Sequence, residues 1–296
     1  MNEKLKLEDI SQNDVNEVPF NYDEMYKDCF VDLDVVIERP PCALSIGKYE
    51  YNGSYYDIDA HTYGEMSATV APSKTKKSFY KSALIASYIG GDSYKYFPNM
   101  KSHRGENDYY IVDIDTEQGQ FYAQKVFRRV QQMTGIQYIN YLPFAMRSKT
   151  PQERVMFVDA LLQDPRFKGK IKFVSIDGIA DLIENTNDIV MSANIANKTM
   201  KWTDDNNLHL HVVIHKLIGV NKPTGHAGSY ILKKGETITF LEKEDENNKD
   251  SNIIVKHKYS RGRSFEDFAF NVNTEGLPYF INGWNPETID EQVKFK

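Results

Sequence analysis

The stretch 67–89 constrains the fold of this chain more than any other part of the sequence. It reads S-A-T-V-A-P-S-K-T-K-K-S-F-Y-K-S-A-L-I-A-S-Y-I, and two glycines follow it. Its first residues are typical of a short buried strand, and residues 77–89 are typical of a helix that Gly90 and Gly91 end. A strand that leads through a tight, lysine-rich loop into a helix predicts a crossover unit of an α/β protein.

The rest of the chain repeats this order of strand and helix. Further strands are expected at 109–114, 136–142, 171–176 and 209–215, and further helices from after Glu117 to about Met133, at 151–162 and at 190–206. Strands that alternate with helices predict a mostly parallel sheet with helices on both faces. Short strands at 237–241, 253–257, 265–272 and 279–281 have turns between them, so we expect an antiparallel extension of the same sheet.

The chain starts with an acidic segment, residues 1–35, that is poor in aliphatic side chains. This composition favours a solvated, partly disordered arm. The alternative is a short helix at 22–30 that docks on a neighbouring subunit. Asn52 and Gly53 lie between two tyrosine-rich runs, a pattern that predicts a β-hairpin. We therefore expect one folded domain over residues 36–296, with this hairpin near its start.

Charge and cysteine content exclude several classes of protein. A net charge of −6 at pH 7 argues against coating nucleic acid by bulk charge, although it leaves room for a local basic channel. Cys29 and Cys42 lack the spacing of a redox or zinc motif, so neither a disulfide framework nor a zinc module is expected. The sequence shows no apolar signal segment and no apolar run of about 18 residues. We therefore expect a cytoplasmic protein without a membrane segment.

The loop within 67–89 is similar to a nucleotide-binding P-loop, G-x-x-x-x-G-K-[ST]. In a P-loop, backbone N–H groups surround the phosphates, the lysine reaches the outer phosphates and the hydroxyl binds Mg²⁺. Lys77 and Ser78 fill the last two positions, whereas Ala71 and Lys76 stand where the pattern has glycine. The alternative is a basic strand-to-helix turn of an ordinary α/β protein. The residues expected around the nucleotide are Ala71, Pro72, Ser73, Lys74, Thr75, Lys76, Lys77, Ser78 and Phe79.

Two acidic residues follow expected strands, where an ATPase needs carboxylates. Asp177 comes directly after the strand at 171–176 and is expected to hold Mg²⁺ opposite Ser78. The alternative for Asp177 is a cap of the turn at Gly178. Glu117 closes a D-T-E run after another strand and is expected to orient or activate the water that attacks the γ-phosphate, with a helix cap as the alternative.

Three histidines lie on the expected strand at 209–215. His215 ends the strand, where it is placed to contact the γ-phosphate and to report its loss; a structural histidine is the alternative. His209 and His211 share its face, but three histidines along one strand span too far to bind a single ion. We therefore expect no metal site on this strand.

The segment 216–229 is rich in glycine, proline and lysine, and Lys233 and Lys234 follow it. It is expected to be a nucleotide-gated loop that touches a polymer partner, with Lys233 or Lys234 reaching a phosphate. An ordinary mobile loop is the alternative.

In combination, these motifs resemble the RecA-like ATPases. Within that group the chain is most similar to RepA-type replicative helicases and to AAA-family ATPases of plasmids, phages and mobile elements. The similar residues are the P-loop, the D-T-E run, I-D-G-I-A-D-L at 176–182, a strand that ends in histidine, and G-H-A-G-S at 225–229. The resemblance covers roughly residues 42–282. It implies a RecA-like P-loop NTPase core, ATP and Mg²⁺ as ligands, and a hexameric ring or filament that binds single-stranded DNA.

The resemblance also assigns a role to each matched position. Lys77 and Ser78 match the P-loop pair, Glu117 the catalytic glutamate, Asp177 the metal-side aspartate and His215 the sensor. Each of these positions would contact the nucleotide, its metal ion or the attacking water.

Other positions match parts that act on DNA or on a neighbouring subunit. The segment 216–229 corresponds to the second DNA-binding loop. Lys233, with Lys234 next, matches a lysine that reaches the neighbour's ATP site. Arg261 and Arg263 are rival candidates for this trans-acting cation, which stabilises charge in the transition state.

The leading hypothesis is an ATP-hydrolysing RecA-like ATPase that acts on DNA, as a helicase or translocase in replication, recombination or mobilisation. The segment 184–192 matches the first DNA-binding loop, yet it carries acid and no lysine or arginine. With the two substituted glycines, this favours an alternative: a nucleotide-dependent switch or loader with slow or no hydrolysis that binds a replication or mobilisation protein. A structural α/β protein is the third hypothesis.

Overall fold

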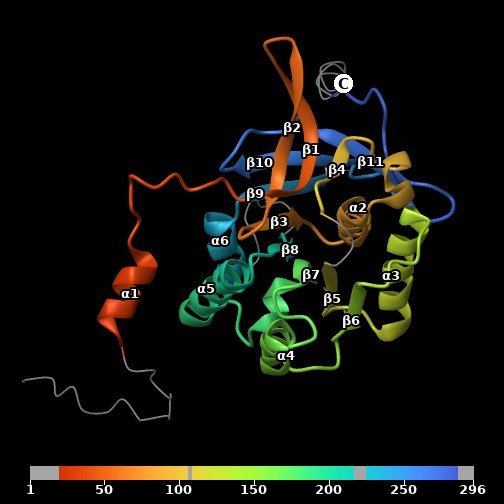
Figure 1. Ribbon diagram of the computed structural model, residues 1–296. Coiled ribbons are helices and arrows are strands. Elements are labelled where there is room, and N and C mark those ends of the chain that lie inside the picture. The colour runs from red at the N-terminus through yellow and green to blue at the C-terminus, as the bar shows by residue number, and fades with distance from the viewer. Residues whose placement is uncertain (1–19, 106–108, 217–224, 286–296) are drawn as a thin grey trace, which may run out of the picture. The chain divides into compact units, whose positions relative to one another are not determined.

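A computed structural model describes residues 20–105, 109–216 and 225–285 of the protein (Figure 1). The chain divides into two compact units, Met1–Arg39 and Pro40–Lys296. In the described part of the first unit, the side chain of Asn21 caps helix α1 (Tyr22–Cys29), all of whose side chains are exposed. The short helix that the sequence allows at 22–30 is confirmed, and residues 1–19 of the expected arm lie outside the described residues.

Nine strands form the central sheet of the second unit, in the order β12-β11-β10-β9-β3-β8-β7-β5-β6. They are β3 (Met66–Ala71), β5 (Tyr110–Asp115), β6 (Tyr141–Ala145), β7 (Ile171–Asp177), β8 (His209–His215), β9 (Thr237–Lys243), β10 (Ile253–Ser260), β11 (Phe268–Val272) and β12 (Pro278–Phe280). The pairs from β9 through β3 to β6 are parallel, and those from β9 to β12 are antiparallel. The expected α/β sheet with an antiparallel extension is therefore confirmed.

Helices cover both faces of this sheet (Figure 1). They are α2 (Lys77–Ile89), α3 (Gln120–Thr134), α4 (Pro151–Gln163), α5 (Ile189–Asn206) and α6 (Gly225–Lys234), with the short 3₁₀ helices η1 (Gly91–Lys95) and η2 (Ile179–Leu182). The apolar sides of α2 and α3 pack into one core, and those of α4, α5 and α6 pack into a second. Strand residues alternate between the two cores, so Ile111 joins the first and its neighbour Val112 joins the second.

A smaller sheet of order β2-β1-β4 packs on the first core. Its strands are β1 (Cys42–Tyr51), β2 (Ser54–Thr62) and β4 (Met100–Ser102). Asn52 and Gly53, with φ of 51° and 75°, form the tight turn between β1 and β2, which confirms the predicted hairpin. No helix or strand is expected between the helix at 77–89 and the strand at 109–114, yet this part of the chain contains η1 and β4. A three-residue strand shows no pattern of its own and depends on pairing with β1.

The strand predicted at 136–142 starts later than expected, as β6. Gly135 ends α3 in the left-handed conformation, and the chain turns before it pairs with β5. The apolar residues at 136 and 139 that suggested a strand are exposed instead.

The prediction of a loop at 216–229 is also wrong in part. Residues 217–224 lie outside the described residues, but from Gly225 onward the chain forms α6. Its buried side chains, including Ala227 and Ile231, have helical spacing, which packs the helix on the second core. Lys233 and Lys234 thus lie in the last turn of a helix.

Three buried histidines lie against one another in the second unit: His61 of β2, and His209 and His211 of β8. Oγ of Ser67 lies 2.8 Å from Nε2 of His209 and 2.9 Å from Nδ1 of His211. Burial lowers the pKa of His209 to about 4 and the pKa of His211 to about 3, and it holds the pKa of His61 well below its ordinary range. The three rings are therefore neutral at pH 7.

We expect this cluster to make the fold sensitive to acid. Below about pH 6.5 the unfolded chain binds protons at these positions, whereas the folded chain binds none until about pH 4, so the free energy of unfolding falls with pH across this window. Each group contributes up to about 1.4 kcal/mol per pH unit. Urea denaturation at a series of pH values measures this dependence. The free energy of unfolding should change less steeply with pH in His211→Gln than in the wild type. In the control His226→Gln, which changes an exposed position on α6, the slope should equal that of the wild type. Equal slopes in His211→Gln and the wild type would contradict this account.

Candidate nucleotide-binding site

The candidate site lies at the carboxyl ends of four neighbouring parallel strands, β3, β8, β7 and β5. The chain leaves β3 through the lysine-rich loop into α2, while His215 ends β8, Asp177 ends β7 and Glu117 follows β5. The carboxyl ends of parallel strands meet at one edge of a sheet, so residues far apart in the sequence come together. This edge brings Lys77, Ser78, Glu117, Asp177 and His215 into one place.

The loop between β3 and α2 contains two residues with a left-handed backbone. Lys74 and Lys76 are left-handed, with φ of 65° and 56°, and Thr75 between them donates its hydroxyl to the carbonyl of Pro72 at 2.6 Å. Within the described residues, the backbone amides of 73–78 donate no hydrogen bond. Amides of alternating left- and right-handed residues point into one concavity, which binds anions. Lys76 takes a conformation that glycine adopts freely, at a cost of about 1–2 kcal/mol.

A chain of polar contacts crosses the site from Lys77 to Glu117. Lys77 is 7% exposed, and its Nζ lies 2.5 Å from Nδ1 of His215, whose Nε2 donates to Oε1 of Glu117. Burial opposes ionisation of Glu117, but the hydrogen bond and charge of His215, with Lys77 nearby, hold the pKa of Glu117 below its ordinary value. Burial also lowers the pKa of Lys77, against the opposing charges of Glu117 and Asp177.

Ser78 and Asp177 form the second contact of the site. Oγ of Ser78 donates to Oδ2 of Asp177 at 3.0 Å, while Oδ1 of Asp177 is buried and has no hydrogen-bond partner among the described residues. An unpartnered carboxylate oxygen beside a serine hydroxyl fits a divalent cation that takes oxygen ligands. In the described ranges, no group of three or more His, Cys, Asp or Glu could hold a metal ion. A cation at Asp177 would therefore also need oxygen atoms of a ligand.

Lys81 and Asp113 lie beside this pair and balance its charge. Both are fully buried; Nζ of Lys81 donates to Asp113 at 2.9 Å and lies 3.6 Å from Oδ2 of Asp177. Tyr141 donates its hydroxyl to the same carboxylate of Asp113 at 2.7 Å. Sequence reasoning misses both residues, although each leaves a signal: Lys81 interrupts an apolar helix one turn after Lys77, and Asp113 interrupts an apolar strand.

Asp115 and Thr116 hold the turn that presents Glu117. Asp115 accepts the backbone N–H groups of Glu117 and Gln118 at 3.0 and 2.8 Å, and burial raises the pKa of Asp115. Thr116 donates its hydroxyl to the carbonyl of Asp177 at 2.7 Å, which ties this turn to the end of β7. The first two residues of the D-T-E run are thus structural, and Glu117 faces the site.

A cavity of about 530 Å³ opens at these residues and is lined by Ser73, Lys74, residues 76–79, Glu117, Arg129 and His215, among others. Ala71, Pro72 and Thr75, which are also expected around the nucleotide, do not line this cavity, and neither does Asp177. Arg129, which sequence reasoning misses, lies 3.7 Å from the centre of the Phe79 ring. Burial lowers the pKa of Arg129 to about 10, so it remains a cation at neutral pH.

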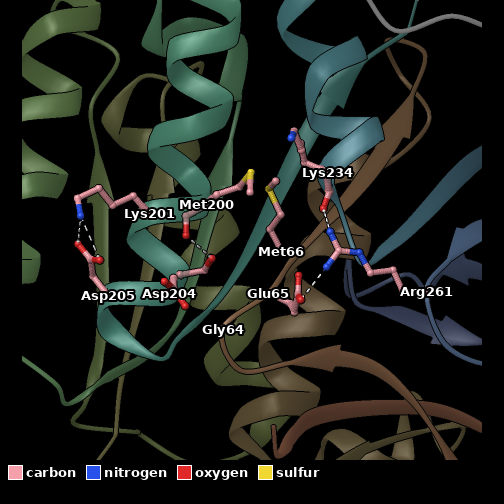
Figure 2. A pocket seen from close by; sticks show the side chains of 10 residues that line it. Gly64, Glu65, Met66, Met200, Lys201, Asp204, Asp205, Lys234 and Arg261 are labelled. Atoms are coloured by element: carbon pink, nitrogen blue, oxygen red, sulfur yellow. Dashed lines mark hydrogen bonds and ion pairs between the residues drawn. The ribbon is translucent and has the colours of Figure 1, made fainter. Parts of the chain in front are cut away.

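The cations considered for a neighbouring subunit's site lie elsewhere. Lys234 and Arg261 line a second cavity of about 350 Å³ at the amino end of β3 (Figure 2), whereas the lysine-rich loop follows the carboxyl end. There Arg261 pairs with Glu65 at 2.7 Å and donates to the carbonyl of Lys234 at 2.8 Å. Lys233 and Arg263 each lie over a tyrosine ring. Among the described residues of one chain, none of these four cations lines the candidate site.

Neither a protein-family model nor a curated protein matches the sequence of this chain. Of the helices in the described ranges, none is both long enough and apolar enough to cross a bilayer.

Proposed function

We propose that this protein binds ATP with Mg²⁺ in the cavity at the lysine-rich loop and hydrolyses it, as an ATPase of the RecA-like type. One observation carries the proposal: Oδ1 of Asp177 is buried beside Ser78, next to the loop amides, and neither it nor these amides has a hydrogen-bond partner in the part of the chain that the structure describes. A nest of amides suits a phosphate, and a free carboxylate oxygen suits a cation. Side by side, they suit a phosphate chain with its metal ion.

The phosphates would lie on the amides of 73–78 and at the N-terminus of α2. The ammonium of Lys77 is buried at this point, and Lys74 adds a second cation at the mouth of the cavity. A helix N-terminus and two ammonium groups stabilise a polyanion more strongly than neutral donors do. Ser78 and Asp177 would hold Mg²⁺, which neutralises charge on the phosphates when it is bound.

Glu117 is the group proposed to orient the attacking water. Its lowered pKa keeps it ionised and able to accept a hydrogen bond or proton from water. Nζ of Lys77 contacts His215, which in turn holds Glu117. A phosphate offers Lys77 a charged acceptor in place of the imidazole nitrogen. The contact between Lys77 and His215 would then break when phosphate binds and form again when phosphate leaves. This change of contact is the sensing role proposed for His215.

Lys77→Ala and Glu117→Gln separate nucleotide binding from hydrolysis. Lys77→Ala should weaken ATP binding at least about tenfold, since it removes a charged hydrogen-bond donor to the phosphates. Glu117→Gln should keep the affinity and lower turnover about 10²- to 10⁴-fold. Calorimetric titration and phosphate release measure the two effects. Lys201→Ala, at the second cavity, is the matched control; unchanged turnover in both site variants would rule out the catalytic assignment.

We also propose that the protein self-associates and acts on single-stranded DNA. Self-association is supported by the described part of the first unit, where Leu33 and Val36 are 93% and 90% exposed and Phe30 and Ile37 are also exposed. So many exposed apolar side chains in one segment are typical of an interaction surface. The proposal of DNA rests on the motifs that resemble RecA-like ATPases.

A nucleotide-dependent switch or loader is the second candidate, and the pairing of Glu117 with His215 favours it, because an engaged carboxylate is less free to activate water. Mass photometry with and without ATP–Mg²⁺ and a short single-stranded oligonucleotide separates the two. The ATPase predicts assembly and salt-sensitive DNA binding that ATP strengthens. The switch predicts no DNA binding but nucleotide-dependent capture of a protein partner. A protein that stays monomeric and binds neither nucleotide, DNA nor a protein partner would contradict both candidate functions.

A further inference from the structure

Lys76 connects the lysine-rich loop to a distant part of the chain. Its Nζ donates to the carbonyl of Ser251 at 3.1 Å and to Oδ1 of Asn271 at 2.9 Å. Ser251 lies in the connection between β9 and β10, and Asn271 lies on β11. The side chain at a position where the P-loop pattern has glycine thus joins the loop to the antiparallel extension of the sheet.

The receiving end of this contact is itself fixed. Nδ2 of Asn271 donates to the carbonyl of Asp250 at 3.1 Å and to Oδ1 of Asn252 at 2.8 Å. The hydroxyl of Ser251 accepts the backbone N–H of Asp245 at 2.8 Å. Ser251 and Asn271 are therefore held in place by other hydrogen bonds. Their contact with Lys76 costs little further conformational entropy in the antiparallel extension.

A second cation joins the same two parts of the structure. Nε of Arg129 donates to the carbonyl of Gly276, in the turn between β11 and β12, at 3.2 Å. Nη1 of the same side chain donates to the carbonyl of Ser78 at 3.3 Å. The extension thus holds the start of α2 at two points, through Lys76 and through Arg129.

We propose that Lys76 is a positioning residue, which holds the loop in its anion-binding shape by tying it to Ser251 and Asn271. This inference rests on the proposed nucleotide site but assigns Lys76 a role that no glycine can take. Lys76 stands at the N-cap of α2 with φ of 56° and ψ of 31°, and no side chain among the described residues caps the helix there. This contact of Lys76 with Ser251 and Asn271, called the tie below, offsets the free-energy cost of the left-handed backbone at Lys76. It also holds the amides of 73–78 in the arrangement that binds an anion, so little further ordering is needed when a ligand binds.

Restoring the glycine of the pattern should therefore weaken the site. In Lys76→Gly, the affinity for ATP–Mg²⁺ should fall about five- to tenfold, and the backbone amides of Phe79 and Tyr80, which donate to the carbonyl of Lys76, should exchange with solvent at least about tenfold faster without ligand. Lys76→Asn tolerates the left-handed backbone but is too short for the tie, so it should behave like Lys76→Gly. Lys76→Arg, which can still reach both acceptors, should restore slow exchange and most of the affinity.

Asn271→Ala supplies the matched change at the other end. It should speed the exchange of the Phe79 and Tyr80 amides in the same way, and the double variant with Lys76→Gly should be no worse than Lys76→Gly alone. Suppose that Lys76→Gly loses affinity for ATP–Mg²⁺ while Asn271→Ala keeps both the affinity and the amide exchange of the wild type. Lys76 would then act by contacting the nucleotide directly, which overturns the inference. Unchanged exchange in every variant also overturns it. Exchange is measured without nucleotide, so it tests the tie even if the wild-type protein binds no ATP.

Discussion

The buried charges around Lys81 are the interaction on which the candidate site depends. Lys81 joins α2 to β5 through Asp113 and to β7 through Asp177. The helix that carries Lys77 and Ser78 is thereby fixed to the strands whose ends carry the carboxylates. Removing one partner of such a buried pair leaves a charge uncompensated and costs about 3–5 kcal/mol. Ser78 and Asp177 are therefore held at a fixed separation, as a shared metal ion requires.

Polar groups without partners converge beside this fixed framework. The amides of 73–78 and Oδ1 of Asp177 are unpaired among the described residues, while the neighbouring Oδ2 is satisfied by Ser78. A buried carboxylate oxygen is normally paired, so the unpaired Oδ1 of Asp177 close to a row of loop and helix-terminal amides favours a ligand that carries both signs of charge. A phosphate chain with a divalent cation is such a ligand, which is why the geometry favours a nucleotide over a simple anion.

Features that depend on local pattern could be predicted from the sequence. The turn at Asn52 and Gly53, the strand, loop and helix of 67–89 and the carboxyl ends of β5, β7 and β8 follow from turn chemistry and periodicity. The placement of β4 and the charged contacts of Lys81 and Arg129 could not be predicted. A short edge strand depends on its pairing partner, and a charged residue in an apolar element suggests exposure until the opposite charge that it meets is known. The tie of Lys76 needs the extension to fold back beside β3, which no local pattern shows.

Hydrogen exchange of the backbone amides with and without ATP–Mg²⁺ tests the central claim most directly, because it locates the ligand as well as detecting it. If the loop between β3 and α2 holds the phosphates, the amides of 73–80 should exchange more slowly with the nucleotide, and those around Lys201 and Arg261 at the second cavity should not change. No protection anywhere, or protection confined to the second cavity, would contradict the assignment of this loop as a nucleotide site.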